Sequence, residues 1–138
     1  MRIPDEIRKC VAFLEYQDPE GYQPVGTVFF VTMSNPDRPD YSFRYAVTAG
    51  HVIKKIEERP TGNSIYLRLN HRVSGVLRIS TWSDNWYFHP TDDVDVAVMP
   101  ISFDDSVDWL FWSVEAFALD KTIKETEITV GDDVFLTG

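Results

Sequence analysis

Short strand-like segments recur along this 138-residue chain, and turn-forming residues close each of them. β-branched and aromatic side chains gather within the segments, whereas Gly, Pro, Asn and Asp cluster between them, which is the pattern of strands joined by turns. We expect strands over Lys9–Tyr16, Val25–Met33, Phe43–Thr48, Ser64–Leu69, Gly75–Trp82, Val94–Ile101 and Asp133–Thr137. The strand-like segments do not alternate with helices, as they would in β-α-β units. The pattern therefore predicts an all-β, antiparallel barrel or sandwich.

One segment departs from the strand pattern. Residues Ala49–Glu58 place Val52, Ile53 and Ile56 on one side at helical spacing, and a Pro-Thr-Gly-Asn run follows at residues 60–63. This spacing predicts a short helix with one buried face.

Charge and cysteine content restrict the partners and the compartment. The net charge is −9, so binding to nucleic acid or to an anionic membrane gains nothing from phosphate neutralisation. The single cysteine, Cys10, lies in an apolar run and is predicted to be a buried, inert thiol. No secretory or membrane-spanning stretch appears. We therefore expect a cytoplasmic protein that binds neither nucleic acid nor membrane.

Two residues stand out as candidates for chemistry. Asp95 directly precedes an apolar run, and a buried carboxylate there costs several kcal/mol unless it is paired. His51 follows a strand and the small residues Ala49 and Gly50, which place it at a strand-to-helix corner. Each residue alone also fits a structural role, as a turn-capping aspartate or a hydrogen-bonded histidine. We give that structural interpretation to His71 and His89, which lie in expected loops.

Four segments together resemble the chymotrypsin-like serine peptidases. In chain order they are Gly26–Val31, Ala46–His51, Asp95–Met99 and Thr129–Gly138. They are similar to the family's strand before the catalytic histidine, the histidine segment, the aspartate strand and the first strand of the second barrel. His51 and Asp95 are 44 positions apart and in the family's order. Val52 and Val28 replace a cysteine and a glycine that are frequent in the family, which fits its disulfide-free, bacterial-type members.

The resemblance implies a fold and a reaction. The fold is a six-stranded Greek-key barrel over residues 1–127, with a short helix after His51 and the start of a second, incomplete barrel at 128–138. The reaction is peptide-bond hydrolysis on a polypeptide substrate without a cofactor. His51 is then the general base, and Asp95 orients its imidazole.

A nucleophile is missing from this pattern. None of the serines lies in a Gly-Asp-Ser-Gly-Gly segment, and all of them precede Thr129. The sequence therefore suggests a fragment of a longer peptidase, inactive by itself, whose unpaired last strand favours self-association.

Three other interpretations stay open. The chain can be a peptidase-derived barrel that no longer cleaves and binds a protein partner instead. His51 and Asp95 can hold a metal ion together with His89 or Asp92. One of the serines present can act as the nucleophile, for example across a dimer.

Overall fold

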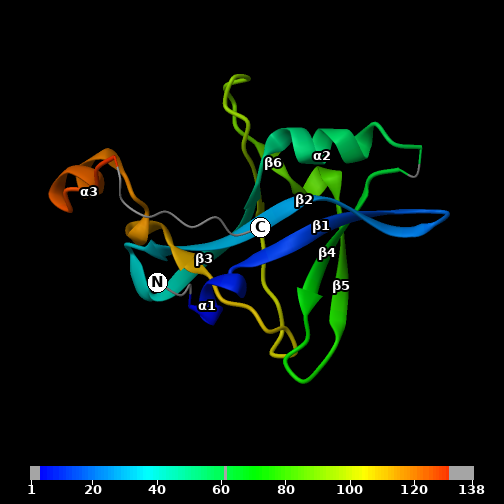
Figure 1. The fold of residues 1–138 in the computed structure, drawn as a ribbon, viewed down its shortest axis with the longest axis horizontal. Helices are drawn as coiled ribbons and strands as arrows, with labels where there is room; N and C mark the ends of the chain where they lie inside the picture. Colours follow the sequence, from blue (N-terminus) through cyan, green and yellow to red (C-terminus); the bar gives the residue numbers. More distant parts are fainter. Residues whose placement is uncertain (1–3, 61, 131–138) are drawn as a thin grey trace.

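A strongly twisted, mostly antiparallel β-sheet dominates the computed structural model, which describes residues 4–60 and 62–130 (Figure 1). Its eight strands are β1 (Val11–Asp18), β2 (Gly21–Asn35), β3 (Arg38–Thr48), β4 (Ser64–Asn70), β5 (Val76–Trp82), β6 (Tyr87–Phe88), β7 (Ala97–Pro100) and β8 (Trp112–Ser113). The helices are α1 (Asp5–Arg8), α2 (Gly50–Glu57) and α3 (Asp120–Glu125), with short 3-10 turns at Ser83–Asn85 and Val114–Ala116. The sheet order is β5-β4-β1-β2-β3-β7-β6, and β8 pairs with β2 in parallel. The expected predominance of antiparallel β-structure is confirmed.

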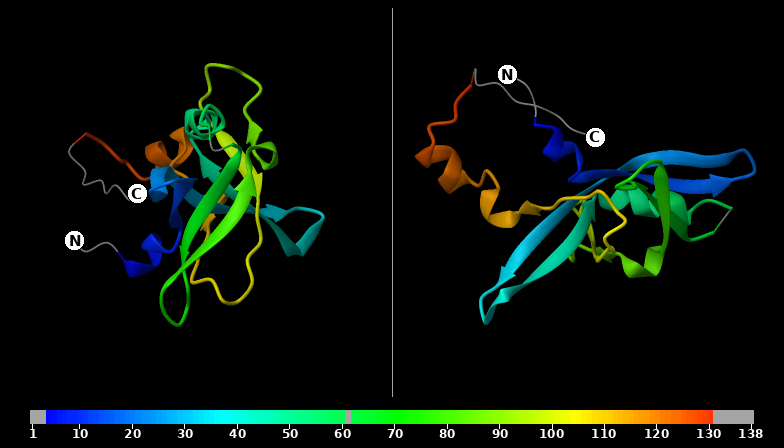
Figure 2. Two further views of the ribbon diagram at one scale, coloured as in Figure 1. Left: turned by 90° about the vertical axis from the view of Figure 1, so that its right-hand side faces the viewer. Right: turned by 90° about the horizontal axis from the view of Figure 1, so that it is seen from below.

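Strands β1, β2 and β3 form two consecutive hairpins. The first half of β2 pairs with β1 and its second half pairs with β3. The turn between β2 and β3 is tighter than the expected loop, because the Asn35 side chain accepts the Asp37 N–H at 3.0 Å. Both strands therefore extend toward this turn, and Figure 2 shows their hairpin projecting from the rest of the sheet.

The fourth and fifth strands form the expected hairpin, and β4 pairs with β1. Strand β7 is shorter than expected and begins only at Ala97. The residues before it bond locally instead of joining the ladder: the Val94 N–H bonds to the Thr91 carbonyl, and the Val96 N–H bonds to the Val94 carbonyl. Residues 89–96 consequently form an excursion that leaves the sheet close to α2 (Figure 1).

Helix α2 covers the core with the face that its sequence predicts. Val52, Ile53 and Ile56 are all buried. They pack with fully buried strand residues, among them Leu14 and Phe30. Cys10 is buried as expected, and burial raises the pKa of its thiol.

The expected closed, six-stranded barrel is not what the described residues form. No pairing joins the two end strands, β5 and β6, within 4–60 and 62–130, so the sheet of eight strands is open. After β7 the chain crosses to the far end of the β4–β5 hairpin, where the Asp108 N–H bonds to the Asn70 carbonyl at 2.8 Å. The rings of Phe103 and Trp109 pack edge-on against Phe30 on the way. This segment therefore reaches the β4–β5 hairpin through an isolated bridge between Val107 and His71, and not through a strand pair.

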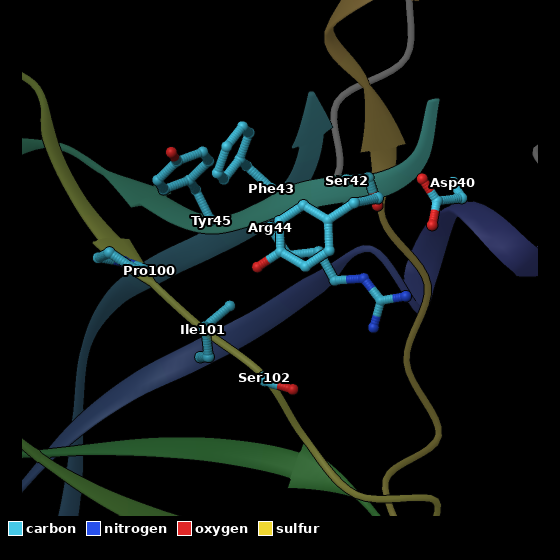
Figure 3. Close-up of a pocket in the computed structure, with 9 residues that line it drawn as sticks. Asp40, Ser42, Phe43, Arg44, Tyr45, Pro100, Ile101 and Ser102 are labelled. Atoms are coloured by element: carbon cyan, nitrogen blue, oxygen red, sulfur yellow. The ribbon is translucent and has the colours of Figure 1, made fainter. Parts of the chain in front are cut away.

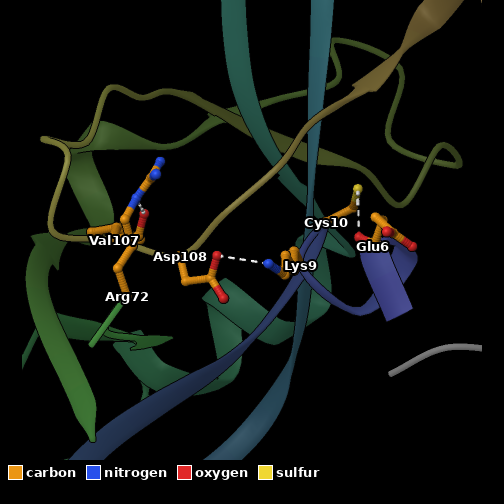
Figure 4. Close-up of polar contacts among 6 residues, drawn as sticks. All are labelled: Glu6, Lys9, Cys10, Arg72, Val107 and Asp108. Carbon is orange, nitrogen blue, oxygen red and sulfur yellow. Dashed lines mark hydrogen bonds and ion pairs between the residues drawn. The ribbon is translucent and has the colours of Figure 1, made fainter. Parts of the chain in front are cut away.

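Side-chain contacts hold the crossing segment in place. Lys9 Nζ pairs with Asp108 Oδ1 at 3.0 Å, and Arg72 Nε donates to the Val107 carbonyl at 3.2 Å (Figure 4). Of the strand expected at Asp133–Thr137, every residue lies outside the described ones. Among the residues that the structure describes, no helix has the length and apolar character to cross a bilayer.

Candidate functional site

His51 lies in the first turn of α2, immediately after β3. Strand β3 ends at Thr48, whose hydroxyl donates to the Thr27 carbonyl at 2.7 Å and fixes the strand end to β2. Ala49 is still extended, with φ −71° and ψ 135°, and the helix begins at Gly50. The chain therefore turns sharply at two small residues, as the sequence predicts, and the imidazole emerges at the corner.

Strand pairing delivers Asp95 to the same corner. Strands β3 and β7 are antiparallel neighbours, and their pairing ends with Thr48 opposite Ala97. Gly50 lies two residues after Thr48, and Asp95 lies two residues before Ala97, so a continuation of the antiparallel register places them opposite each other. A carboxylate two residues before β7 thus reaches the first turn of the helix, although 44 positions separate Asp95 from His51.

Two hydrogen bonds join Asp95 to His51. Asp95 Oδ1 accepts the His51 backbone N–H at 2.7 Å, and Asp95 Oδ2 contacts His51 Nδ1 at 2.5 Å. The first bond satisfies one of the free N–H groups at the start of α2. The second favours the tautomer that carries its proton on Nδ1, which leaves Nε2 as an acceptor. The structure therefore brings together the two residues that the sequence singled out.

The expectation that Asp95 is buried is wrong. The side chains of His51 and Asp95 are 55% and 54% exposed, because the excursion of residues 89–96 holds Asp95 outside the sheet. The pKa of Asp95 is nevertheless lowered. The side-chain hydrogen bond to His51 is the largest cause, the backbone hydrogen bond from His51 is the next, and the charge of Lys54 adds a smaller effect.

Three further residues shape the site, and we did not single them out from the sequence as site residues. A Cβ atom on Gly50 would lie 3.1 Å from Asp95 Oδ1 and 3.3 Å from Phe88 Cδ1, so only glycine leaves the carboxylate its present place without displacing a neighbour. Lys54 lies one helical turn after His51, with its Nζ 5.4 Å from the centre of the Phe88 ring. The spacing of His51 and Lys54 on one helix is the signal that could have indicated the lysine.

No hydroxyl or thiol among residues 4–60 and 62–130 is hydrogen-bonded to His51 Nε2. Ser34 donates to Glu115, Ser106 donates to Asp104, and Ser83 is buried. The described residues thus provide an oriented, half-exposed imidazole with no nucleophile bonded to its Nε2.

The other two histidines have the structural role that we expected. His71 Nδ1 accepts the Val73 N–H, and His89 Nδ1 accepts the Thr91 N–H, both at 3.1 Å. The described residues contain no group of three His, Cys, Asp or Glu side chains arranged to hold a metal ion. The alternative ligand set, in which His89 or Asp92 joins His51 and Asp95, is therefore not assembled.

Comparison of the chain with models of known protein families, with curated proteins and with solved structures finds no match.

Proposed function

We propose that His51 and Asp95 are the general base and its orienting carboxylate in a serine endopeptidase of the trypsin-like type. The observation that carries the proposal is the double contact of Asp95 with the backbone N–H and Nδ1 of His51, at 2.7 and 2.5 Å. A carboxylate held at two points fixes both the tautomer and the direction of the imidazole. A general base that must take a proton at Nε2 needs both.

The proton transfers follow from this geometry. The serine hydroxyl passes its proton to His51 Nε2 as its oxygen attacks the peptide carbonyl, and the imidazolium later protonates the leaving amine. Asp95 stays anionic throughout and stabilises the imidazolium through Nδ1–H. The proposal requires a nucleophilic serine and an oxyanion hole that the described residues do not place at His51, so we expect the 138-residue chain alone to be inactive.

The strand order supports the same assignment. The spatial order β4-β1-β2-β3 is the order of a Greek key, in which the fourth strand returns to lie beside the first. That motif is part of the first barrel that the sequence resemblance implies for residues 1–127. His51 follows the end of β3, a strand of this motif, and Asp95 precedes β7, the antiparallel neighbour of β3.

A second function is favoured by one feature of the site. Asp95 Oδ1 bonds to a backbone N–H at the start of α2, and this contact stabilises the helix whether or not the imidazole takes part in chemistry. In this interpretation the chain is a peptidase-derived domain that binds a protein partner and no longer cleaves.

A fluorophosphonate probe distinguishes the two functions. The probe reacts with a serine that a histidine activates, and it is applied to the protein isolated from its natural source and to recombinant variants with the same full coding sequence. We expect labelling of one serine, a loss of at least 100-fold in labelling rate for His51→Ala, and an unchanged rate for His89→Ala.

Asp95→Asn should slow labelling strongly, and Asp92→Asn, which changes an exposed carboxylate of the same excursion, should not. Absence of labelling of the natural protein would contradict the peptidase assignment and favour the binding domain. Labelling that His51→Ala leaves intact would also contradict it.

A further inference from the structure

The N-terminal half of β3, at the end away from His51, borders an open groove. The groove has a volume of about 570 Å³. It lies between β3 and the segment that continues from β7, and it is lined by Asp40, Tyr41, Ser42, Phe43, Arg44, Tyr45, Pro100, Ile101 and Ser102. Figure 3 shows the two chain segments separating along it, with the Ile101 side chain between them. His51 follows the other end of the strand, so the groove is separate from the site described above.

One wall of the groove is an unpaired edge of β3. Strand β7 pairs with β3 only from Tyr45 to Thr48, and the last contact is the Ile101 N–H bonded to the Arg44 carbonyl at 3.1 Å. The peptide groups of a strand point alternately to its two sides. The N–H and C=O of Ser42 therefore point to the same side as those of Arg44. No described strand pairs with β3 there.

Arg44 presents an unused charge to the groove. Its guanidinium lies 4.8 Å from the centre of the Phe111 ring and 5.6 Å from that of Trp109. The two rings hold the side chain in place, and no carboxylate or carbonyl within 4–60 and 62–130 pairs with it. In Figure 3 the guanidinium extends away from the Phe43 and Tyr45 rings, which project to the other side of β3. An arginine fixed in this way keeps its N–H donors available for an external acceptor.

We propose that this groove binds an extended polypeptide segment that carries an acidic side chain. The segment adds to the β3 edge through main-chain hydrogen bonds to Ser42, which is the usual way in which an exposed sheet edge takes up a peptide. Its carboxylate pairs with Arg44. Asp40 lies elsewhere in the groove lining, so a second acidic residue beside it is disfavoured and the preferred segment has one carboxylate at the Arg44 position. The proposal does not depend on the activity of His51.

The binding of two short peptides tests this. One is an acetylated and amidated pentapeptide with a central glutamate flanked by valines, and the other has glutamine in place of the glutamate. We expect the glutamate peptide to bind the full chain roughly tenfold more tightly than the glutamine peptide in calorimetry, since a hydrogen bond to a charged group contributes at least that factor. Arg44→Gln should remove this preference, and Lys55→Gln, which removes one positive charge on α2 outside the groove lining, should keep it.

Two further measurements keep the proposal open to contradiction. A glutamate peptide with methylated backbone nitrogens should lose binding without any change in the protein, because it cannot pair with the Ser42 edge. The proposal is overturned if both peptides bind equally, if neither binds at millimolar concentration, or if Lys55→Gln removes the preference as well. A mass in sedimentation that doubles with concentration for the native chain and not for Arg44→Gln would show a second copy as the occupant, and would also overturn it.

Discussion

Glu15 and Asp95 are paired carboxylates in two very different surroundings. Glu15, on β1, is 5% exposed, and its oxygens face Arg78 Nε at 2.7 Å and Arg68 Nε at 3.8 Å. Asp95 is half-exposed, and its partner is a histidine. Arginine keeps its charge at every physiological pH, whereas histidine changes its charge near neutrality.

The difference separates a structural ion pair from a pair suited to proton transfer. Loss of the charge of a buried carboxylate between permanent cations is costly, because it leaves those cations without their anion. A surface carboxylate can stay beside an imidazole at low cost whether the imidazole is neutral or charged. The proposed reaction requires the imidazole to change between these two states. The largest consequences of mutation should therefore be on stability at Glu15 and on function at Asp95.

Removal of the buried charge tests this contrast most strongly. Glu15→Gln leaves Arg68 and Arg78 without their anion, so we expect the free energy of unfolding to fall by about 2 kcal/mol. This is less than the roughly 3–5 kcal/mol of a fully buried pair, because both arginines are partly exposed. Urea unfolding measures the change. Glu20→Gln, at an exposed position, is the control and should change stability by less than about 0.5 kcal/mol. An equal loss for Glu15→Gln and Asp95→Asn would break the contrast.

Two glycines extend the comparison from charge to packing. A Cβ atom on Gly26 would lie 2.8 Å from Val52 Cγ1 in the core, and the branched Val52 has little rotamer freedom on a helix. We expect Gly26→Ala to lower the free energy of unfolding by about 1–3 kcal/mol. Gly50→Ala displaces the exposed Asp95 instead, and alanine favours the helix, so its net cost should stay below about 1 kcal/mol.

The second glycine should affect the site more than the fold. Urea unfolding gives both stabilities, and the fluorophosphonate labelling rate gives the effect on the site. Gly50→Ala should slow labelling because Asp95 no longer holds the imidazole. If Gly50→Ala destabilises the chain more than Gly26→Ala and leaves labelling unchanged, the division between core and site is wrong.

Much of the fold could be predicted because local rules agree with the tertiary structure. The buried face of α2 follows from the spacing of Val52, Ile53 and Ile56, and the β4–β5 hairpin follows from alternation on both sides of a turn. The open sheet could not be predicted, since it depends on where the chain runs after β7. That path is set by long-range contacts such as the packing of Trp109 against Phe30.

The candidate site was predicted in its residues and not in its surroundings. His51 and Asp95 meet because the pairing of β3 with β7 is a regular antiparallel register. Asp95 was expected to be buried because the apolar run after it was interpreted as one continuous strand. Local hydrogen bonds at residues 91–96 end that strand early and expose the carboxylate. The carboxylate that is buried is Glu15, which lies within the largely apolar strand β1. Its two arginine partners come from β4 and β5, far away in the sequence.

A smaller effect, whose sign follows from the pKa of Asp95, is expected on the free energy of unfolding at low pH. Hydrogen bonds from His51 lower the pKa of Asp95 in the folded state, so the folded chain binds fewer protons there than the unfolded chain. This contribution is present above about pH 4, the usual aspartate value, and is lost as the pH falls below it. Asp95→Asn should therefore lose less stability than the native chain between pH 5 and pH 3. Urea unfolding at each pH measures this difference.

Asp104 is a second carboxylate with which the effect of Asp95 on acid stability can be compared. Its pKa is also lowered, by hydrogen bonds from the Ser106 side chain and backbone, so it contributes to the same acid transition from another place. Asp104→Asn should flatten the transition as well, and the two changes together should add, because no contact joins the two carboxylates. A profile for Asp95→Asn that matches the native chain would show that the contact with His51 does not persist in solution.

The smallest expected effect concerns Lys54, the one permanent cation among the described residues whose charge is identified as acting on Asp95. Lys54 lowers the pKa of Asp95 through its charge, as the least of the identified causes. Lys54→Gln should therefore raise the pKa of Asp95 slightly, measured by NMR titration of its side-chain carboxyl carbon. Lys55→Gln removes the same charge one position away on α2, and Lys55 is not among the groups that shift Asp95, so it should leave this pKa unchanged. Equal shifts in the two variants would mean that Asp95 responds to the overall charge of the helix. In that case His51, through its imidazole and its backbone N–H, is the one described residue that acts specifically on Asp95, which makes the contrast with the doubly paired Glu15 sharper still.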